Sequence, residues 1–350
     1  MRRRTVLALG VLALAGGCGT QAPPYQSAIS LVVPGAGRGD VVARELKALI
    51  EARRWARAVR IRRSRGGGSG GEPESDETDG EPGRDPGRDA GRDPGGGFER
   101  RRSGGSAVGS RPADAPSAEL MVADPALLAQ AAMGRGPLPA TRTAPLVRLA
   151  GEWEVLVAAP GSGVGTFERF ARDLVRDPGG RKVAGGAVGG PEHQAFGLTA
   201  VGLGADPRLI DYAAFEDGAQ AVDALLDGRV AAGFAGQRDV VPHIRAGRLR
   251  PLVVSSPERL PGVDAPTLLE SGVGVVFANW WGLLTPLAQA AGGRERLLDL
   301  CRAIGGSPLW ERVCARNGWT PLYLEGDDFR QWLAAEARRT TRLLADLGLR

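Results

Sequence analysis

The stretch from residue 29 to residue 50, ISLVVPGAGRGDVVARELKALI, changes its hydrophobic pattern twice within a short span. Residues 29–33 form an apolar, β-branched run that is too short for a buried helix and is stopped by Pro34, which predicts a buried parallel strand. A glycine loop follows, and Asp40 can cap the next helix, whose apolar positions recur on one face. A helix that begins at such a loop directs free N–H groups and the positive end of its dipole toward an anion.

The same sequence of strand, glycine loop and helix recurs at residues 182–193, KVAGGAVGGPEH, where Pro191 starts a helix that carries His193. A tight turn without a ligand is the alternative for each loop. A dinucleotide fold is disfavoured, because the first loop reads Gly-x-Gly-x-Gly and the fingerprint requires Gly-x-Gly-x-x-Gly with a later acidic residue. Two such units in one chain predict two lobes that face a cleft.

Short apolar runs alternate with amphipathic stretches along the rest of the chain, with two extended segments at residues 146–149 and 155–159. Further strands are predicted at residues 59–61, 119–122, 209–213, 230–234, 249–254 and 273–284. Helices are predicted at residues 125–133, 166–175, 218–226 and 240–246, in a short segment ending at Gly272, and at residues 295–304, 309–317 and 328–347. This alternation predicts an α/β fold with helices on both faces of parallel sheets.

The composition changes abruptly between Ser64 and Pro116, where the chain consists mainly of Gly, Arg, Asp, Glu, Pro and Ser. Such a segment has almost no apolar surface to bury against its ordering entropy, so we expect it to be disordered. The fold is therefore expected to close around a low-complexity insert.

The N-terminus carries three arginines, an apolar run from Val6 to Leu14, and small residues that end at Cys18. This pattern resembles the lipobox of bacterial lipoproteins, in which the cysteine is lipidated and becomes the first mature residue. The apolar run is too short to span a bilayer. We therefore expect a signal peptide at residues 1–17, export by the general or the twin-arginine route, and a protein tethered to the outer face of the cytoplasmic membrane.

Outside the cytoplasm, Cys301 and Cys314 could form a disulfide, and two buried thiols are the alternative. The formal charge of +5 comes almost wholly from arginine, and no nucleic-acid motif accompanies the basic cluster at residues 53–65. Neither histidine, His193 or His243, has a metal-ligand partner at suitable spacing, and no nucleophile or phosphate-loop motif occurs. We therefore expect neither a metal, nor a cofactor, nor an enzyme.

Several motifs in the C-terminal half resemble the solute receptors of tripartite tricarboxylate transporters. They are the segment from Arg248 to Leu268, then Asn279-Trp280-Trp281-Gly282, Asn317-Gly318-Trp319-Thr320 and Gly326-Asp327-Asp328-Phe329. The resemblance runs from about residue 29 to residue 350, interrupted by the insert. It implies a two-lobed, type II periplasmic-binding-protein fold in which each lobe is a mainly parallel sheet flanked by helices.

On this basis residues 18–28 are expected to be a tether, residues 29–148 and 255–350 one lobe, and residues 149–254 the other, with crossings near 149–157 and 249–255. The resemblance implies a monomeric lipoprotein that captures a citrate-like di- or tricarboxylate and delivers it to membrane transporter subunits. The alternative is a carboxylate-sensing or surface interaction lipoprotein that is not coupled to transport. The implied solute contacts are Gly35, Ala36, Gly37, Gly39, Asp40, Gly186, Ala187, Gly189, Gly190, His193, Phe215, Glu216, Gly218, Gly236, Asn279 and Trp280.

Overall fold

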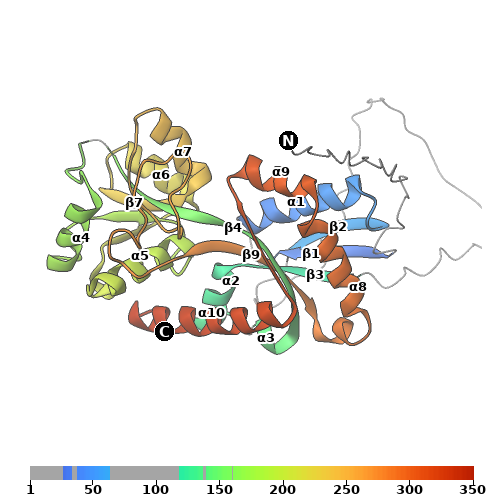
Figure 1. Ribbon diagram of the computed structural model, residues 1–350. Helices are drawn as coiled ribbons and strands as arrows, with labels where there is room; N and C mark the ends of the chain where they lie inside the picture. Colours follow the sequence, from blue (N-terminus) through green and yellow to red (C-terminus); the bar gives the residue numbers. More distant parts are fainter. Residues whose placement is uncertain (1–26, 34–37, 64–117, 137–138, 160) are drawn as a thin grey trace, which may run out of the picture.

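The computed structural model describes residues 27–33, 38–63, 118–136, 139–159 and 161–350. Within these residues one curled sheet has the strand order β2-β1-β3-β9-β4-β7-β5-β6, and β8 and β10 pair with β4 outside this path. The sheet passes through two lobes that lie on either side of the long central strands β4 and β9 (Figure 1). The predicted two-lobed α/β fold is confirmed.

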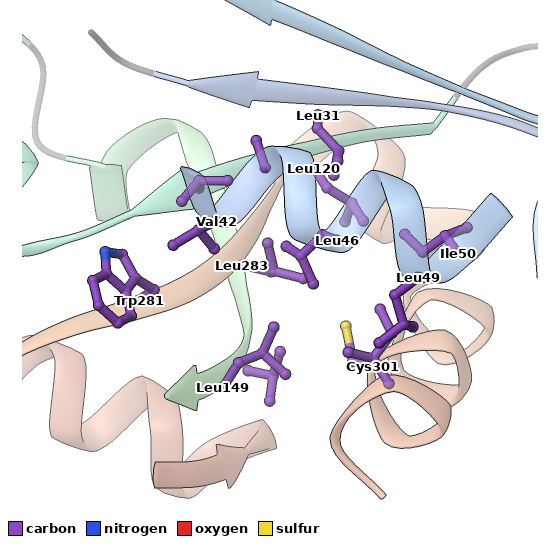
Figure 2. Close-up of a cluster of buried hydrophobic side chains, with 14 of the residues drawn as sticks. Leu31, Val42, Leu46, Leu49, Ile50, Leu120, Leu149, Trp281, Leu283 and Cys301 are labelled. Carbon is purple, nitrogen blue, oxygen red and sulfur yellow. The ribbon is translucent and has the colours of Figure 1, made fainter. Parts of the chain in front are cut away.

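The first lobe begins with three parallel strands, β1 (Ala28–Val33), β2 (Ala58–Arg63) and β3 (Ala118–Ala123). Helix α1 (Arg38–Ala52) buries one apolar face, which includes Val42 and Leu46. In Figure 2 these side chains meet Trp281 and Leu283 of β9 and Cys301 of α8. Helices α8 (Leu287–Gly305) and α9 (Pro308–Asn317) supply the other side of this core.

Strand β4 (Thr143–Ala158) belongs to both lobes, because its two halves pair with different partners. Residues 143–153 pair with β9 (Ala278–Pro286), and β10 (Thr320–Glu325) pairs with the same part of β4. Residues 154–158 pair with β7 and β8 instead. The crossing between lobes therefore lies at Trp153 and Glu154, inside one continuous strand and within residues 149–157, where the sequence analysis placed a crossing.

The second lobe contains the parallel strands β5 (Val183–Gly185), β6 (Tyr212–Ala214) and β7 (Ala232–Gly236), with β8 (Arg250–Val254) beside β4. Helices α4 (Phe167–Arg176) and α5 (Pro191–Leu203) contribute to one apolar cluster, and α6 (Gly218–Leu226) and α7 (Gln237–Arg245) to the other. A short 3-10 helix (Pro207–Leu209) precedes β6.

Helix α10 (Gly326–Asp346) runs along one side of both lobes, where it packs against α2 (Pro125–Ala132), β4 and α5 (Figure 1). The short helix α3 (Pro139–Arg142) leads into β4. Every helix in the described part of the chain is too short or too polar to span a bilayer.

Three details differ from the sequence expectations. The segment before Gly272 forms turns, since Leu268 and Val273 anchor an irregular chain to the apolar cluster of the second lobe. Residues up to Phe277 also pack there, so the return crossing is β9 and lies later than residues 249–255. The strands β1, β2 and β3 of the first lobe and β5, β6 and β7 of the second are parallel as predicted. By contrast, β4 pairs antiparallel with β7, β8, β9 and β10, and β3 pairs antiparallel with β9.

Candidate functional site

A cavity of about 180 Å³ lies between the two lobes. The first lobe contributes Val33, Arg38 and Gly39, where β1 leads into α1, and Asp124, Ala126, Leu127 and Gln130 around the start of α2. The second lobe contributes Gly186, Ala187, Gly190, Pro191 and Glu192 at the start of α5, and Glu216, Asp217 and Gly218 at the start of α6. Asn279 of β9 completes the wall. Both glycine-loop units therefore face the same cavity.

The structure brings part of the predicted contact set together. Seven predicted residues line the cavity, namely Gly39, Gly186, Ala187, Gly190, Glu216, Gly218 and Asn279. Gly35, Ala36 and Gly37, like Cys18 and the low-complexity insert, lie outside the described residues.

The remaining six predicted residues are placed outside the wall. Asp40 is in the first turn of α1, which begins at Arg38, and pairs with Arg63 rather than capping the helix. Trp280 is buried against Phe329 and Trp332, and Phe215 is half-buried beside the core of the second lobe. Gly189 and His193 lie behind the wall, as described below, and Gly236 lies beside Glu152, since a Cβ built on Gly236 would come within 2.5 Å of that carboxylate.

His193 braces the second glycine loop. Its Nδ1 accepts a hydrogen bond from the Gly189 N–H at 3.0 Å, and its ring stacks on Tyr212 at 4.1 Å between centroids. The Tyr212 hydroxyl donates to the Gly186 carbonyl at 2.9 Å. Burial lowers the pKa of His193 to about 4, so the ring is neutral and Nδ1 remains an acceptor. Gly189 has a φ of 78°, which favours glycine and fixes the turn.

The positive ends of the helices near the cavity are largely neutralised by this chain's own carboxylates. Asp124 caps α2 by accepting from the Leu127 N–H at 2.8 Å, and Asp217 caps α6 by accepting from Gln220 at 3.0 Å. Glu152 accepts from the Arg238 N–H at 2.9 Å in the first turn of α7. Helices α5 and α7 both have a glycine N-cap without a side-chain bond, Gly190 and Gly236, and the first turn of α5 carries its own acid, Glu192. Free helix ends were expected at the starts of α6 and α7, and the structure shows that a carboxylate already binds each of them, whereas the Asp124 cap of α2 follows from its Asp-Pro pair in the sequence.

Five charged side chains gather beside the cavity, at the point where β4 crosses between the lobes. They are Arg38, Glu152, Glu154, Glu192 and Asp239, of which Arg38 and Glu192 line the cavity wall. Arg38 of the first lobe pairs with Glu152 of β4 and with Asp239 of the second lobe. A Cβ built on Gly218 would lie 2.9 Å from Asp239, 3.3 Å from Arg38 and 3.4 Å from Glu192, which places these three groups under the first turn of α6. Arg38 is thus an ionic link between the lobes.

The cluster holds more acid than base, and burial makes the ionised form of each acid costly. Burial raises the pKa of Glu152 to about 7 against the opposing effect of Arg38. Burial and the neighbouring Glu192 raise the pKa of Glu154 further, and both of its oxygens lack a hydrogen-bond partner within the described part of the chain. Burial also raises the pKa of Glu192, again against Arg38. Charge balance in this cluster therefore depends on protons.

Sequence reasoning missed Arg38, Glu152, Glu154, Glu192 and Asp239 as a group. One signal was present, because Glu152 and Glu154 point to the same side of a strand whose neighbours are otherwise apolar. Two glutamates at that spacing in a buried strand require a partner or a proton. For Asp239, 201 residues from Arg38 in the sequence, no local pattern indicates the contact.

Comparison with known proteins assigns the chain to a family. The model of the tripartite tricarboxylate transporter family receptor matches residues 138–349. This chain belongs to that receptor family. Its members are receptors.

Protein BugT of Bordetella pertussis is 27% identical over 200 residues, which are 55% of this chain and 59% of BugT. The matched region thus spans about three fifths of this curated relative. A TctC solute binding protein from Polaromonas superposes with a TM-score of 0.65 at 18% identity, covering 93% of this chain and 100% of the other. An R. palustris protein solved with adipate gives 0.65 at 20% identity, covering 94% and 99%. These two structures support the fold.

Proposed function

We propose that this receptor is an extracytoplasmic protein that captures a small carboxylate between its lobes and delivers it to membrane transporter subunits. The observation that carries the proposal is the cavity between the lobes at the start of α5. Gly190, Pro191 and Glu192 of that helix line the cavity, and the helix has no side-chain cap. The positive end of the helix dipole favours a carboxylate there, beside Glu192, whose own carboxylate accepts from backbone N–H groups of Glu192 and Gly186. The solute would be bound and released without chemical change.

The acidic wall bears on which carboxylate is captured. A di- or tricarboxylate such as citrate would place further negative charge near Asp124, Glu192 and Asp217. Two like charges about 5 Å apart repel by about 3 kcal/mol at an effective dielectric constant of about 20. We therefore propose that one carboxylate of the solute is held at the start of α5. We also propose that citrate, with three carboxylates, binds more weakly than solutes with fewer carboxylates. The R. palustris neighbour was solved with adipate, a dicarboxylate of moderate length.

A thermal-shift panel of mono-, di- and tricarboxylates tests the proposal. A solute at a hundred times its dissociation constant stabilises the fold by about 2.7 kcal/mol. Ala187→Trp should abolish the shift, because Ala187 is exposed in the cavity wall and an indole there would fill much of the space. Val188→Trp is the matched control, since Val188 is exposed and lies outside the wall. A panel that leaves the melting curve of the folded wild type unmoved would refute carboxylate capture.

We also propose that the protein is anchored to the outer face of the cytoplasmic membrane through lipid on Cys18. Support comes from the arginine-led apolar run that ends at this cysteine. Cys18→Ala should release the protein from the membrane fraction or block its processing. Recovery of the wild type as a cytosolic protein that retains residues 1–17 would contradict the proposal.

A further inference from the structure

We propose that the cavity also contains a subsite for an organic ammonium group, formed by Glu192 with Glu154 behind it. The captured solute would then be an amino-carboxylate, with its carboxylate at the start of α5 and its ammonium group against the acids. This inference rests on the proposed function, because it assigns a second pole to the solute of the same cavity.

The charges of the wall are the first support. The charged residues of the wall are Asp124, Glu192, Glu216, Asp217 and Arg38. The guanidinium of Arg38 is already bonded to Glu152 and Asp239, so its charge is balanced within the cluster. A solute therefore meets a wall whose uncompensated charge is negative, which favours a cation.

The position of Glu192 is the second support. This side chain lines the cavity although only 4% of the residue is exposed. A Cβ built on Gly186 would lie 2.7 Å from Glu192 Oε2, so the carboxylate sits directly beside the glycine loop. Within the described residues the one cation that acts on it is Arg38, which is already engaged by two other acids. Glu192 is thus a buried acid at the cavity without a cation of its own.

Glu154 supplies an independent third observation. It is fully buried, and neither carboxyl oxygen has a hydrogen-bond partner among the residues that the structure describes. Its charge acts on Glu192 and on the Tyr212 hydroxyl, which is bonded to the wall residue Gly186. Buried acids without partners are rare because their desolvation is costly. An ammonium group beside Glu192 would donate to that carboxylate and place a positive charge near the acidic pair.

The test uses solute pairs that differ in one terminal group. Succinate is paired with β-alanine, glutarate with γ-aminobutyrate, and adipate with δ-aminovalerate, and putrescine is included as a diamine. Titration calorimetry on the full chain measures each dissociation constant. We expect the amino member of at least one pair to bind at least about tenfold more tightly than its dicarboxylate, a difference of about 1.4 kcal/mol.

Glu192→Gln should remove this preference, and Glu168→Gln, the same change at an exposed residue of α4, should leave it intact.

The pH dependence of the preference is a second test, which is measured on the wild type alone. The preference for the amino member should fall as the pH is lowered, because protonation of Glu192 removes its charge. The groups that face Glu192 in this titration are Arg38, Asp239, Glu152, Glu154 and Tyr212.

The outcomes separate the two proposals. Tighter binding of the dicarboxylate in every pair would overturn the ammonium subsite and leave carboxylate capture standing. Binding of putrescine alone would support the subsite and overturn carboxylate capture. An unchanged preference in a folded Glu192→Gln variant, or a preference that does not respond to pH, would overturn the assignment to Glu192. Failure of every member to bind would overturn both proposals.

Discussion

Asp124 offers a test of how the cavity affects stability. It caps α2 through the Leu127 N–H, and burial raises the pKa of its carboxyl from 3.8 to about 6. The opposing contributions come from backbone N–H groups, and no neighbouring charge contributes. The substitution Asp124→Asn keeps the size and the capping oxygen but cannot titrate, since Asn and Asp cap helices about equally well.

The sign follows from proton linkage. The folded pKa of Asp124 lies above the unfolded value, so the folded state binds more protons between these two pH values. The contribution of Asp124 to the stability of the wild type is therefore fully present below about pH 4 and is lost as the pH rises through about 6. At about 1.4 kcal/mol per pH unit, the difference between 3.8 and about 6 corresponds to about 3 kcal/mol. Asp124 keeps part of its surface in the cavity, so we expect about 2 to 3 kcal/mol.

Urea denaturation of both proteins at a series of pH values, without solute, measures the effect. The stability of Asp124→Asn relative to wild type should rise by about 2 to 3 kcal/mol between about pH 4 and about pH 7. Asp206→Asn is a control, because the hydrogen bond that Asp206 accepts from Arg208 lowers the pKa of Asp206, so the stability of that variant relative to wild type should change only below about pH 4 and stay nearly constant from there to about pH 7. A difference between Asp124→Asn and wild type that does not change with pH would refute the reasoning.

Two further predictions concern Arg38 and the cysteines. Arg38→Ala should destabilise the fold by about 3 to 5 kcal/mol in urea denaturation at neutral pH, because it leaves Glu152 buried without its cation, and a loss below about 1 kcal/mol would contradict this. Arg38→Lys should recover part of the loss. Cys301 and Cys314 are buried free thiols whose pKa burial raises to about 12, so on a Cys18→Ala background thiol labelling should require unfolding, and rapid labelling of the native protein would contradict this.

Elements with a strong local signal were predicted from the sequence. Helix α6 has the predicted bounds, and α2 begins after Asp124 as its Asp-Pro pair indicates. The β1 strand and the glycine loop at the start of α5 were also located, because a short β-branched run and a Gly-Pro boundary are specific signals. The motifs of the C-terminal half then indicated the receptor family, which the family match confirms.

Elements that depend on long-range pairing were not predicted. β10 (Thr320–Glu325) was missed because its short, half-exposed run becomes a strand only by pairing with β4. The charge cluster was missed for the same reason, since Arg38 and Glu152 are 114 residues apart in the sequence. The glycine loops predicted where the cavity lies, but its charge comes from acids that five separate elements bring together.

The charge cluster also connects the proposed solute to the protonation of the protein. Arg38 is its single cation, whereas Glu152, Glu154, Glu192 and Asp239 are acids, so the empty cluster carries excess negative charge unless some carboxyls are protonated. Burial raises the pKa values of Glu154 and Glu192, which favours the protonated form of each acid. An ammonium group beside Glu192 would supply the same charge and displace a proton. Binding of an amino-carboxylate should therefore release protons near neutral pH, and calorimetry in buffers of different ionisation enthalpy would count them; a count of zero would contradict this exchange.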